Sequence, residues 1–167
     1  MSYKTREGGA TVTVFVPYDC NNNCPFCINK AEYANNEGFS AEKICESIKY
    51  IDSITPNCDI VFTGGEPLVK KNIVSICRRT AQVPGIREVC MTTNGTLLAP
   101  MAKDLRQAGV SRLNISLDTL HPERFRSMTR CGELQDVLDG TGGFVMLNAQ
   151  NLGGEDSGGG VQGIDGG

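Results

Sequence analysis

The sequence predicts an α/β fold in the form of a partial TIM-like (β/α) barrel of about four to five βα units. Short runs of β-branched residues alternate with segments of helical apolar periodicity, and this alternation indicates right-handed βαβ crossovers and a parallel sheet. Four or five such units are too few for a complete barrel of eight units. Cysteine-rich or polar motifs follow several predicted strands directly, which is where parallel α/β sheets place their functional residues.

The first half of the chain contains two predicted pairs of strand and helix. Residues 11–17 alternate β-branched side chains and predict a strand. A helix over 40–54 follows, with Ser40 as its N-cap and isoleucines at helical spacing. Residues 59–63 predict the second strand, and 70–82 predict the helix after it.

The second half of the chain repeats this alternation. The same periodicities predict strands at 87–93, 112–117 and 144–148, and helices at 100–108, 122–129 and 133–139. Gly109 is placed to close the helix before it, because glycine adopts the left-handed conformation that ends many helices. Residues 149–167 contain eight glycines and no aromatic residue. We therefore expect a disordered tail there, after an ordered core of residues 1–148.

The charge and hydropathy of the chain argue against some classes of protein. The net charge of −3 gives no electrostatic reason to expect nucleic acid or an anionic membrane as a partner. No apolar run reaches the roughly 18 residues of a membrane span, and the first residues lack the apolar segment of a signal peptide. We therefore expect a cytoplasmic location.

Eight cysteines are many for such a chain, and two interpretations compete. An exported disulfide protein uses an even number of cysteines but needs an export signal. A metal or redox protein clusters some cysteines and scatters the others. Cys20, Cys24 and Cys27 lie within eight residues, which favours the second interpretation. The other five are expected to be small core residues: Cys45, Cys58, Cys77, Cys90 and Cys131.

The clustered cysteines form a C-x3-C-x2-C motif. Three thiolates from one short loop can bind a single soft metal centre. If they bind three irons of a cubane iron–sulfur cluster, the fourth iron stays open, as a chelating substrate requires. A structural zinc ion would instead need a fourth ligand. A Cys3His zinc site that includes the lone His121 is one alternative, and three cysteines without metal are another.

With Phe26 directly before the third cysteine, this motif resembles the signature of the radical S-adenosylmethionine (SAM) superfamily. The resemblance implies that Cys20, Cys24 and Cys27 bind a [4Fe-4S] cluster. It further implies that SAM chelates the open iron and that Phe26 packs near the adenine of SAM.

Gly64, Gly65 and Glu66 resemble the Gly-Gly-Glu motif of the same family. Glycines let a ligand approach the backbone closely, and a glutamate accepts hydrogen bonds from an ammonium group. The resemblance implies that Glu66 holds the methionyl amine of SAM. A simple turn between strand and helix is the alternative for this segment taken alone.

Two further segments resemble one branch of the family, which contains the GTP 3',8-cyclase of the molybdopterin pathway. They are Met-Thr-Thr-Asn-Gly at 91–95 and Asn-Ile-Ser-Leu-Asp-Thr-Leu at 114–120. The resemblance implies that Ser116 contacts SAM, that Thr92 lies at the substrate, and that Asn94 belongs to the cofactor site. Residues 1–148 are accordingly interpreted as a truncated radical SAM core.

Three positions depart from that branch. Thr13, Val61 and Met146 stand where the branch has two arginines and a lysine that bind the GTP phosphates. A triphosphate needs charge-assisted donors, and these three side chains supply none. The branch also has a second three-cysteine cluster in a C-terminal region, and no second cluster of this kind occurs among these 167 residues. The sequence therefore predicts SAM chemistry without predicting GTP as the substrate.

The resulting expectation is a radical SAM iron–sulfur enzyme. Its reduced cluster would cleave SAM to a 5'-deoxyadenosyl radical, which takes a hydrogen atom from a small-molecule or peptide substrate. A flavodoxin- or ferredoxin-type protein would supply the electron. Three alternatives stay open: a GTP 3',8-cyclase-like protein of molybdenum cofactor biosynthesis, a peptide-modifying or activating enzyme whose barrel a partner protein completes, and an inactive truncated fragment that binds a cluster.

Overall fold

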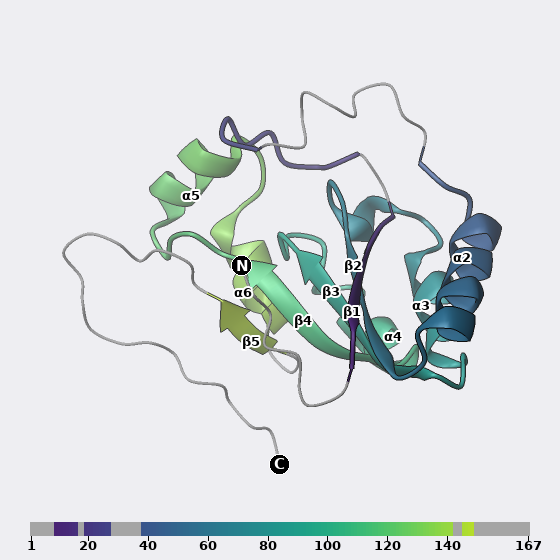
Figure 1. The fold of residues 1–167 in the computed structure, drawn as a ribbon. Helices are drawn as coiled ribbons and strands as arrows, with labels where there is room; N and C mark the ends of the chain where they lie inside the picture. Colours follow the sequence, from purple (N-terminus) through teal and green to yellow (C-terminus); the bar gives the residue numbers. More distant parts are fainter. Residues whose placement is uncertain (1–8, 17–18, 28–37, 142–144, 149–167) are drawn as a thin grey trace, which may run out of the picture.

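A parallel sheet defines the architecture of the chain (Figure 1). The structure is a computed structural model that describes residues 9–16, 19–27 and 38–141 and the backbone of 145–148; the tail predicted at 149–167 lies outside the described residues. Five strands pair in the order β1-β2-β3-β4-β5. They are β1 (Thr11–Phe15), β2 (Cys58–Thr63), β3 (Ile86–Thr93), β4 (Val110–Ser116) and β5 (Val145–Asn148). Because each strand lies beside its neighbour in sequence, this is the order of successive βα units in a barrel wall, and the predicted α/β fold is confirmed.

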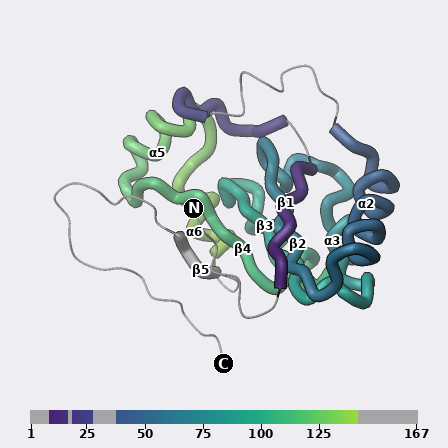
Figure 2. Tube along the Cα trace, in the orientation of Figure 1, coloured from purple at the N-terminus to yellow at the C-terminus, as the bar shows by residue number. Residues whose placement is uncertain are grey.

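Helices connect the strands, and the first three α-helices cover one face of the sheet (Figures 1 and 2). In chain order the helices are α2 (Ala41–Ile54), the 3-10 helix η1 (Pro67–Val69), α3 (Ile73–Ala81), α4 (Ala102–Gln107), α5 (Pro122–Thr129) and α6 (Leu134–Thr141). Their apolar side chains pack in one core against side chains of the strands, among them Phe62, Met91 and Ile115. Of the helices in the described ranges, none combines the length and apolarity that crossing a membrane requires.

The predicted N-cap of α2 and the predicted end of α4 are confirmed, and the predicted beginning of α3 is corrected. Ser40 Oγ accepts a hydrogen bond of 3.2 Å from the backbone N–H three residues later and caps α2. Gly109 follows the end of α4 with a φ of 91°. The helix predicted over 70–82 begins only at Ile73. The chain leaves β2 through the separate turn of η1, whose N-cap is Glu66, and this turn delays the helix.

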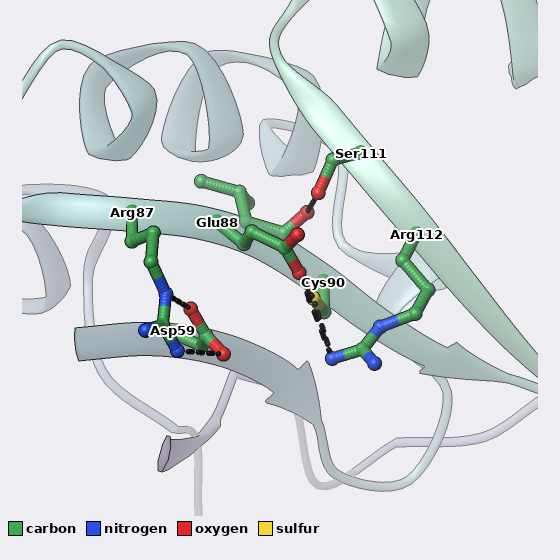
Figure 3. Close-up of polar contacts among 7 residues, drawn as sticks. Asp59, Arg87, Glu88, Cys90, Ser111 and Arg112 are labelled. Carbon is green, nitrogen blue, oxygen red and sulfur yellow. Dashed lines mark hydrogen bonds and ion pairs between the residues drawn. The ribbon is translucent and has the colours of Figure 1, made fainter. Parts of the chain in front are cut away.

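Two groups of charged side chains lie near the beginnings of β2, β3 and β4 (Figure 3). Arg87 donates two hydrogen bonds to the carboxylate of Asp59, at 2.8 and 2.9 Å. An Arg112 nitrogen lies 3.3 Å from Cys90 Sγ and 3.8 Å from a carboxylate oxygen of Glu88. Opposite charges therefore compensate one another at this end of the sheet, as partly buried charges require.

Four of the five cysteines outside the motif are core residues, as predicted. Cys45, Cys58, Cys77 and Cys90 are buried, and burial raises the pKa of the Cys77 thiol to about 12. Cys131 is exposed, so the prediction is wrong for this residue. Its position explains the difference, because α5 ends in a left-handed C-cap and Cys131 follows in the loop outside the core.

Candidate active site

The carboxyl ends of the strands surround one cavity of ≈ 450 Å³. Its wall contains all ten residues that the sequence predicts as site residues: Cys20, Cys24, Phe26, Cys27, Gly64, Gly65, Glu66, Thr92, Asn94 and Ser116. They come from the loop after β1 and from the ends of β2, β3 and β4. Parallel strands place their carboxyl ends at one edge of the sheet, which is why segments distant in sequence meet here. The roles of these residues remain predictions.

Backbone hydrogen bonds hold the cysteine loop at the cavity, beside α5 (Figure 1). Glu66 N donates to Asp19 O at 2.8 Å and ties the loop to the segment after β2. Asn23 N donates to Thr129 O, also at 2.8 Å, and ties the loop to the last turn of α5. The loop is thus held from two sides by elements that line the cavity.

The three cysteines of the motif present thiols of suitable chemistry for an iron–sulfur cluster. All three line the cavity, and none forms a disulfide. Loss of hydration raises the pKa of the Cys20 thiol, the hydrogen bond from Asn22 N opposes this rise, and the nearby carboxyl of Glu66 adds to it. Metal binding needs the thiolate, so cluster assembly has to remove a proton from this group.

The geometry does not support the zinc alternative. Among the residues that the structure describes, no three His, Cys, Asp or Glu side chains converge on a position for one metal ion. His121 is the N-cap residue of α5 and is not part of the cavity wall. A cubane also needs the three thiolates around one cluster, but each thiolate binds a different iron, so they need not meet at the position of a single ion. The donor set therefore fits a cluster better than a single ion.

Glu66 is almost fully buried, with 1% of its surface exposed. Its carboxylate accepts three hydrogen bonds, from Leu68 N at 3.0 Å, Thr93 Oγ1 at 2.6 Å and Asn94 N at 2.7 Å. Burial raises the pKa of this carboxyl, and the three donors act against the rise. A carboxylate has about four acceptor positions, so about one is left for the ammonium group predicted to bind here. Glu66 first of all connects the ends of β2 and β3.

The remaining predicted residues leave room in the cavity. Gly64 has a φ of 144°, which residues with side chains rarely adopt, and it brings bare backbone to the cavity wall. Thr92 and Ser116 contribute small hydroxyl side chains from the ends of β3 and β4. Phe26 has 57% of its surface exposed, so its ring is free to contact a planar ligand.

Asn21 and Thr96 were not predicted from the sequence, and together with the predicted Asn94 they hold the cysteine loop to the end of β3. Asn21 Nδ2 donates to Thr96 Oγ1 at 2.8 Å, and Asn94 Nδ2 donates to Asn21 Oδ1 at 2.9 Å. Phe125 and Met128 of α5 also line the cavity, and the sequence did not predict them as site residues. The sequence carries two signals for these contacts. One is the run of three asparagines between the first two cysteines, and the other is the i, i+3 spacing of two apolar residues on the predicted helix.

A comparison with known proteins decides the family of the chain. The sequence profile of the Radical SAM superfamily matches residues 14–142. The chain belongs to the radical SAM superfamily. The matched range contains the cysteine motif, the Gly-Gly-Glu segment and both strand-end segments. Membership in this family of enzymes implies SAM and an iron–sulfur cluster as cofactors.

Sequence relatives of this radical SAM chain are named GTP 3',8-cyclase. The protein of Geobacter sulfurreducens is 46% identical over 124 residues, which cover 72% of this chain and 38% of the relative. The protein of Pseudomonas entomophila is 58% identical over 81 residues, which cover 48% of this chain and 24% of the relative. The predicted resemblance to this branch is confirmed, although the chain spans only 24% to 38% of the length of these relatives.

Solved structures share the radical SAM fold of this chain. Native anSMEcpe with bound AdoMet and Cp18Cys peptide superposes with a TM-score of 0.61 at 17% identity, covering 85% of this chain and 42% of that protein. BtrN in complex with AdoMet and 2-DOIA superposes with a TM-score of 0.57 at 20% identity, covering 86% of this chain and 58% of that protein. At such identities the likeness concerns the fold alone.

Proposed function

We propose that this chain binds one [4Fe-4S] cluster through Cys20, Cys24 and Cys27 and cleaves SAM reductively. One observation carries the proposal: the three cysteines line the same ≈ 450 Å³ cavity as the Gly-Gly-Glu segment and the ends of β3 and β4. Three thiolates leave one iron of a cubane without a protein ligand. When bound, such a cluster supplies the electron that splits SAM into methionine and a 5'-deoxyadenosyl radical.

The chain's own residues would orient SAM in this cavity. Gly64 and Gly65 admit the methionyl group to the backbone, since no side chain stands in the way. The remaining acceptor position of Glu66 takes the ammonium group in a charge-assisted hydrogen bond. The exposed ring of Phe26 packs on the adenine, and the hydroxyl of Ser116 binds a further polar group of SAM.

The substrate is proposed to be a small molecule or peptide that loses a hydrogen atom to the radical. Thr92, on β3, lies at the substrate, and Asn94 completes the cofactor site. Phe125 and Met128 supply an apolar wall that keeps water away from the radical. A flavodoxin- or ferredoxin-type protein supplies the electron. A partner protein completes the barrel, and the location is cytoplasmic.

GTP 3',8-cyclase-like activity is a second candidate, favoured by the 46% identity to the Geobacter sulfurreducens enzyme. Thr13 and Val61, which replace the two arginines of that branch, are direct partners in the register of β1 and β2. Met146, which replaces the lysine, is the register partner of Asn114. GTP phosphates would therefore need cations other than those of the branch.

Anaerobic reconstitution with iron and sulfide tests the proposal. We expect visible charge-transfer absorbance and four irons per chain, followed by release of 5'-deoxyadenosine when SAM and dithionite are added. Cys24→Ala should abolish both, whereas Cys131→Ala, which removes an exposed cysteine outside the motif, should preserve both. A Cys24→Ala protein that binds the cluster and cleaves SAM as well as the parent contradicts the proposal. A cyclised product formed from GTP would establish the second candidate.

A further inference from the structure

We propose that Asn94 is a positioning residue that raises the reduction potential of the cluster through an N–H···S hydrogen bond to Cys20. Asn94 Nδ2 lies 3.9 Å from Cys20 Sγ, and both residues belong to the wall of the cavity. The inference rests on the proposed cluster site, because Cys20 is one of its three proposed ligands.

A closed ring of hydrogen bonds decides how the amide of Asn94 is oriented. Its Oδ1 accepts from Thr96 N at 3.0 Å and from Thr96 Oγ1 at 2.7 Å. Thr96 Oγ1 accepts from Asn21 Nδ2 at 2.8 Å, and Asn21 Oδ1 accepts from Asn94 Nδ2 at 2.9 Å. A backbone N–H can only donate, so the amide oxygen of Asn94 has to face Thr96. The amide nitrogen then faces the cysteine loop.

The amide nitrogen of Asn94 has two hydrogens to donate. One of them is used by Asn21, and the other is left for Cys20 Sγ. The same sulfur also accepts a hydrogen bond of 3.4 Å from Asn22 N. The backbone of Asn94 is itself held, because its N–H donates to Glu66 Oε2 at 2.7 Å. The donor is therefore held by its backbone and by the ring.

An N–H donor near a ligand sulfur favours the reduced form of a cluster. Reduction adds negative charge to the irons and their thiolates, and a hydrogen bond to sulfur stabilises this charge. Such hydrogen bonds are among the groups around a cluster that set its potential. The ring formed by Asn21, Asn94 and Thr96 thus makes the cluster easier to reduce.

The reduction potential of the anaerobically reconstituted full chain, titrated with detection by electron paramagnetic resonance and without SAM, tests this inference. Asn94→Leu removes the donor, and Asn94→Asp keeps an acceptor for Thr96 while it removes the N–H groups. Both should lower the ratio of reduced to oxidised cluster at a fixed potential by about threefold to tenfold, where tenfold is about 59 mV for one electron. Thr96→Val opens the ring but keeps the donor, so its shift should be smaller.

Asn23→Ala is the matched control, because Asn23 lies in the same loop with an exposed side chain. Its potential should equal that of the parent. If both Asn94 variants assemble the cluster with the potential of the parent, the inference is wrong and the proposed function stands. The inference is also wrong if Thr96→Val shifts the reduction potential as much as Asn94→Leu does. The potential would then depend on the position of the cysteine loop and not on the N–H donor of Asn94. If the parent itself assembles no cluster, the proposed function fails, and the inference fails with it.

Discussion

Thr93 Oγ1 donates a hydrogen bond of 2.6 Å to Glu66 Oε1 and joins the ends of two adjacent strands. Both residues are buried, with 2% and 1% of their surface exposed. The same hydroxyl accepts a hydrogen bond of 3.0 Å from Gly95 N, so one side chain links the Gly-Gly-Glu segment to the turn after β3. The rim of the cavity is therefore held together by polar contacts within the protein.

Glu66→Gln should lower the free energy of unfolding by about 1–3 kcal/mol. Glutamine has one acceptor oxygen, whereas Glu66 accepts hydrogen bonds on both of its oxygens. One buried donor is then left without a partner. Urea unfolding of the apo protein, followed by circular dichroism, measures the difference. Glu46→Gln on the exposed side of α2 is the control, and equal losses in the two variants would refute the connecting role of Glu66.

The stability difference between the parent and Glu66→Gln should shrink as the pH rises. Burial raises the pKa of Glu66 above 4.5 in the folded chain, so the native state binds more protons than the unfolded state at pH values between the unfolded and the folded pKa. This contribution to stability is fully present below pH 4.5 and is lost as the pH rises through the folded pKa. Urea unfolding of both proteins across this range gives the difference. A difference that grows with pH would mean that the pKa is lowered.

Thiol labelling with iodoacetamide and mass spectrometry should distinguish five of the eight cysteines by their reactivity. Cys77, with its pKa of about 12, should resist labelling at neutral pH in every state of the folded protein. Cys20, Cys24 and Cys27 should react in the apo protein and become protected after reconstitution. Cys131 is exposed and should stay reactive in both states. Protection of Cys131 by the cluster would place it among the ligands and contradict the three-cysteine assignment.

Phe26→Ala should weaken SAM binding and leave the fold intact. The ring is 57% exposed, so its removal should change the unfolding free energy by less than about 0.5 kcal/mol. An aromatic ring stacked on a base contributes about 1–3 kcal/mol, which is about 5- to 150-fold in affinity. Calorimetric titration of SAM into the reconstituted protein measures this loss. Phe39→Ala is the matched control, because Phe39 is 56% exposed and lies outside the cavity wall. Equal affinity of the Phe26 variant and the parent would exclude the stacking role.

Local sequence features were sufficient to predict most of the fold. Alternating β-branched residues and helical periodicity depend on neighbours a few residues away, so strands and helices could be inferred without tertiary contacts. The cap at Ser40 and the helix end at Gly109 are of the same local kind. Because parallel strands place their carboxyl ends together, the position of the motifs on one rim followed from the order of the elements.

Contacts between distant residues could not be inferred in this way. Glu66 and Thr93 are 27 positions apart, and Asn21 and Asn94 are 73 apart. No periodicity relates residues at such separations. Whether two such side chains come into contact depends on the register of the strands and on the path of the loops. The sequence by itself determined which chemical groups this protein carries to the ends of its strands. Only the tertiary structure decided that Glu66 is largely occupied by protein donors and that Asn94 faces Cys20, because hydrogen bonding depends on geometry within a few tenths of an ångström.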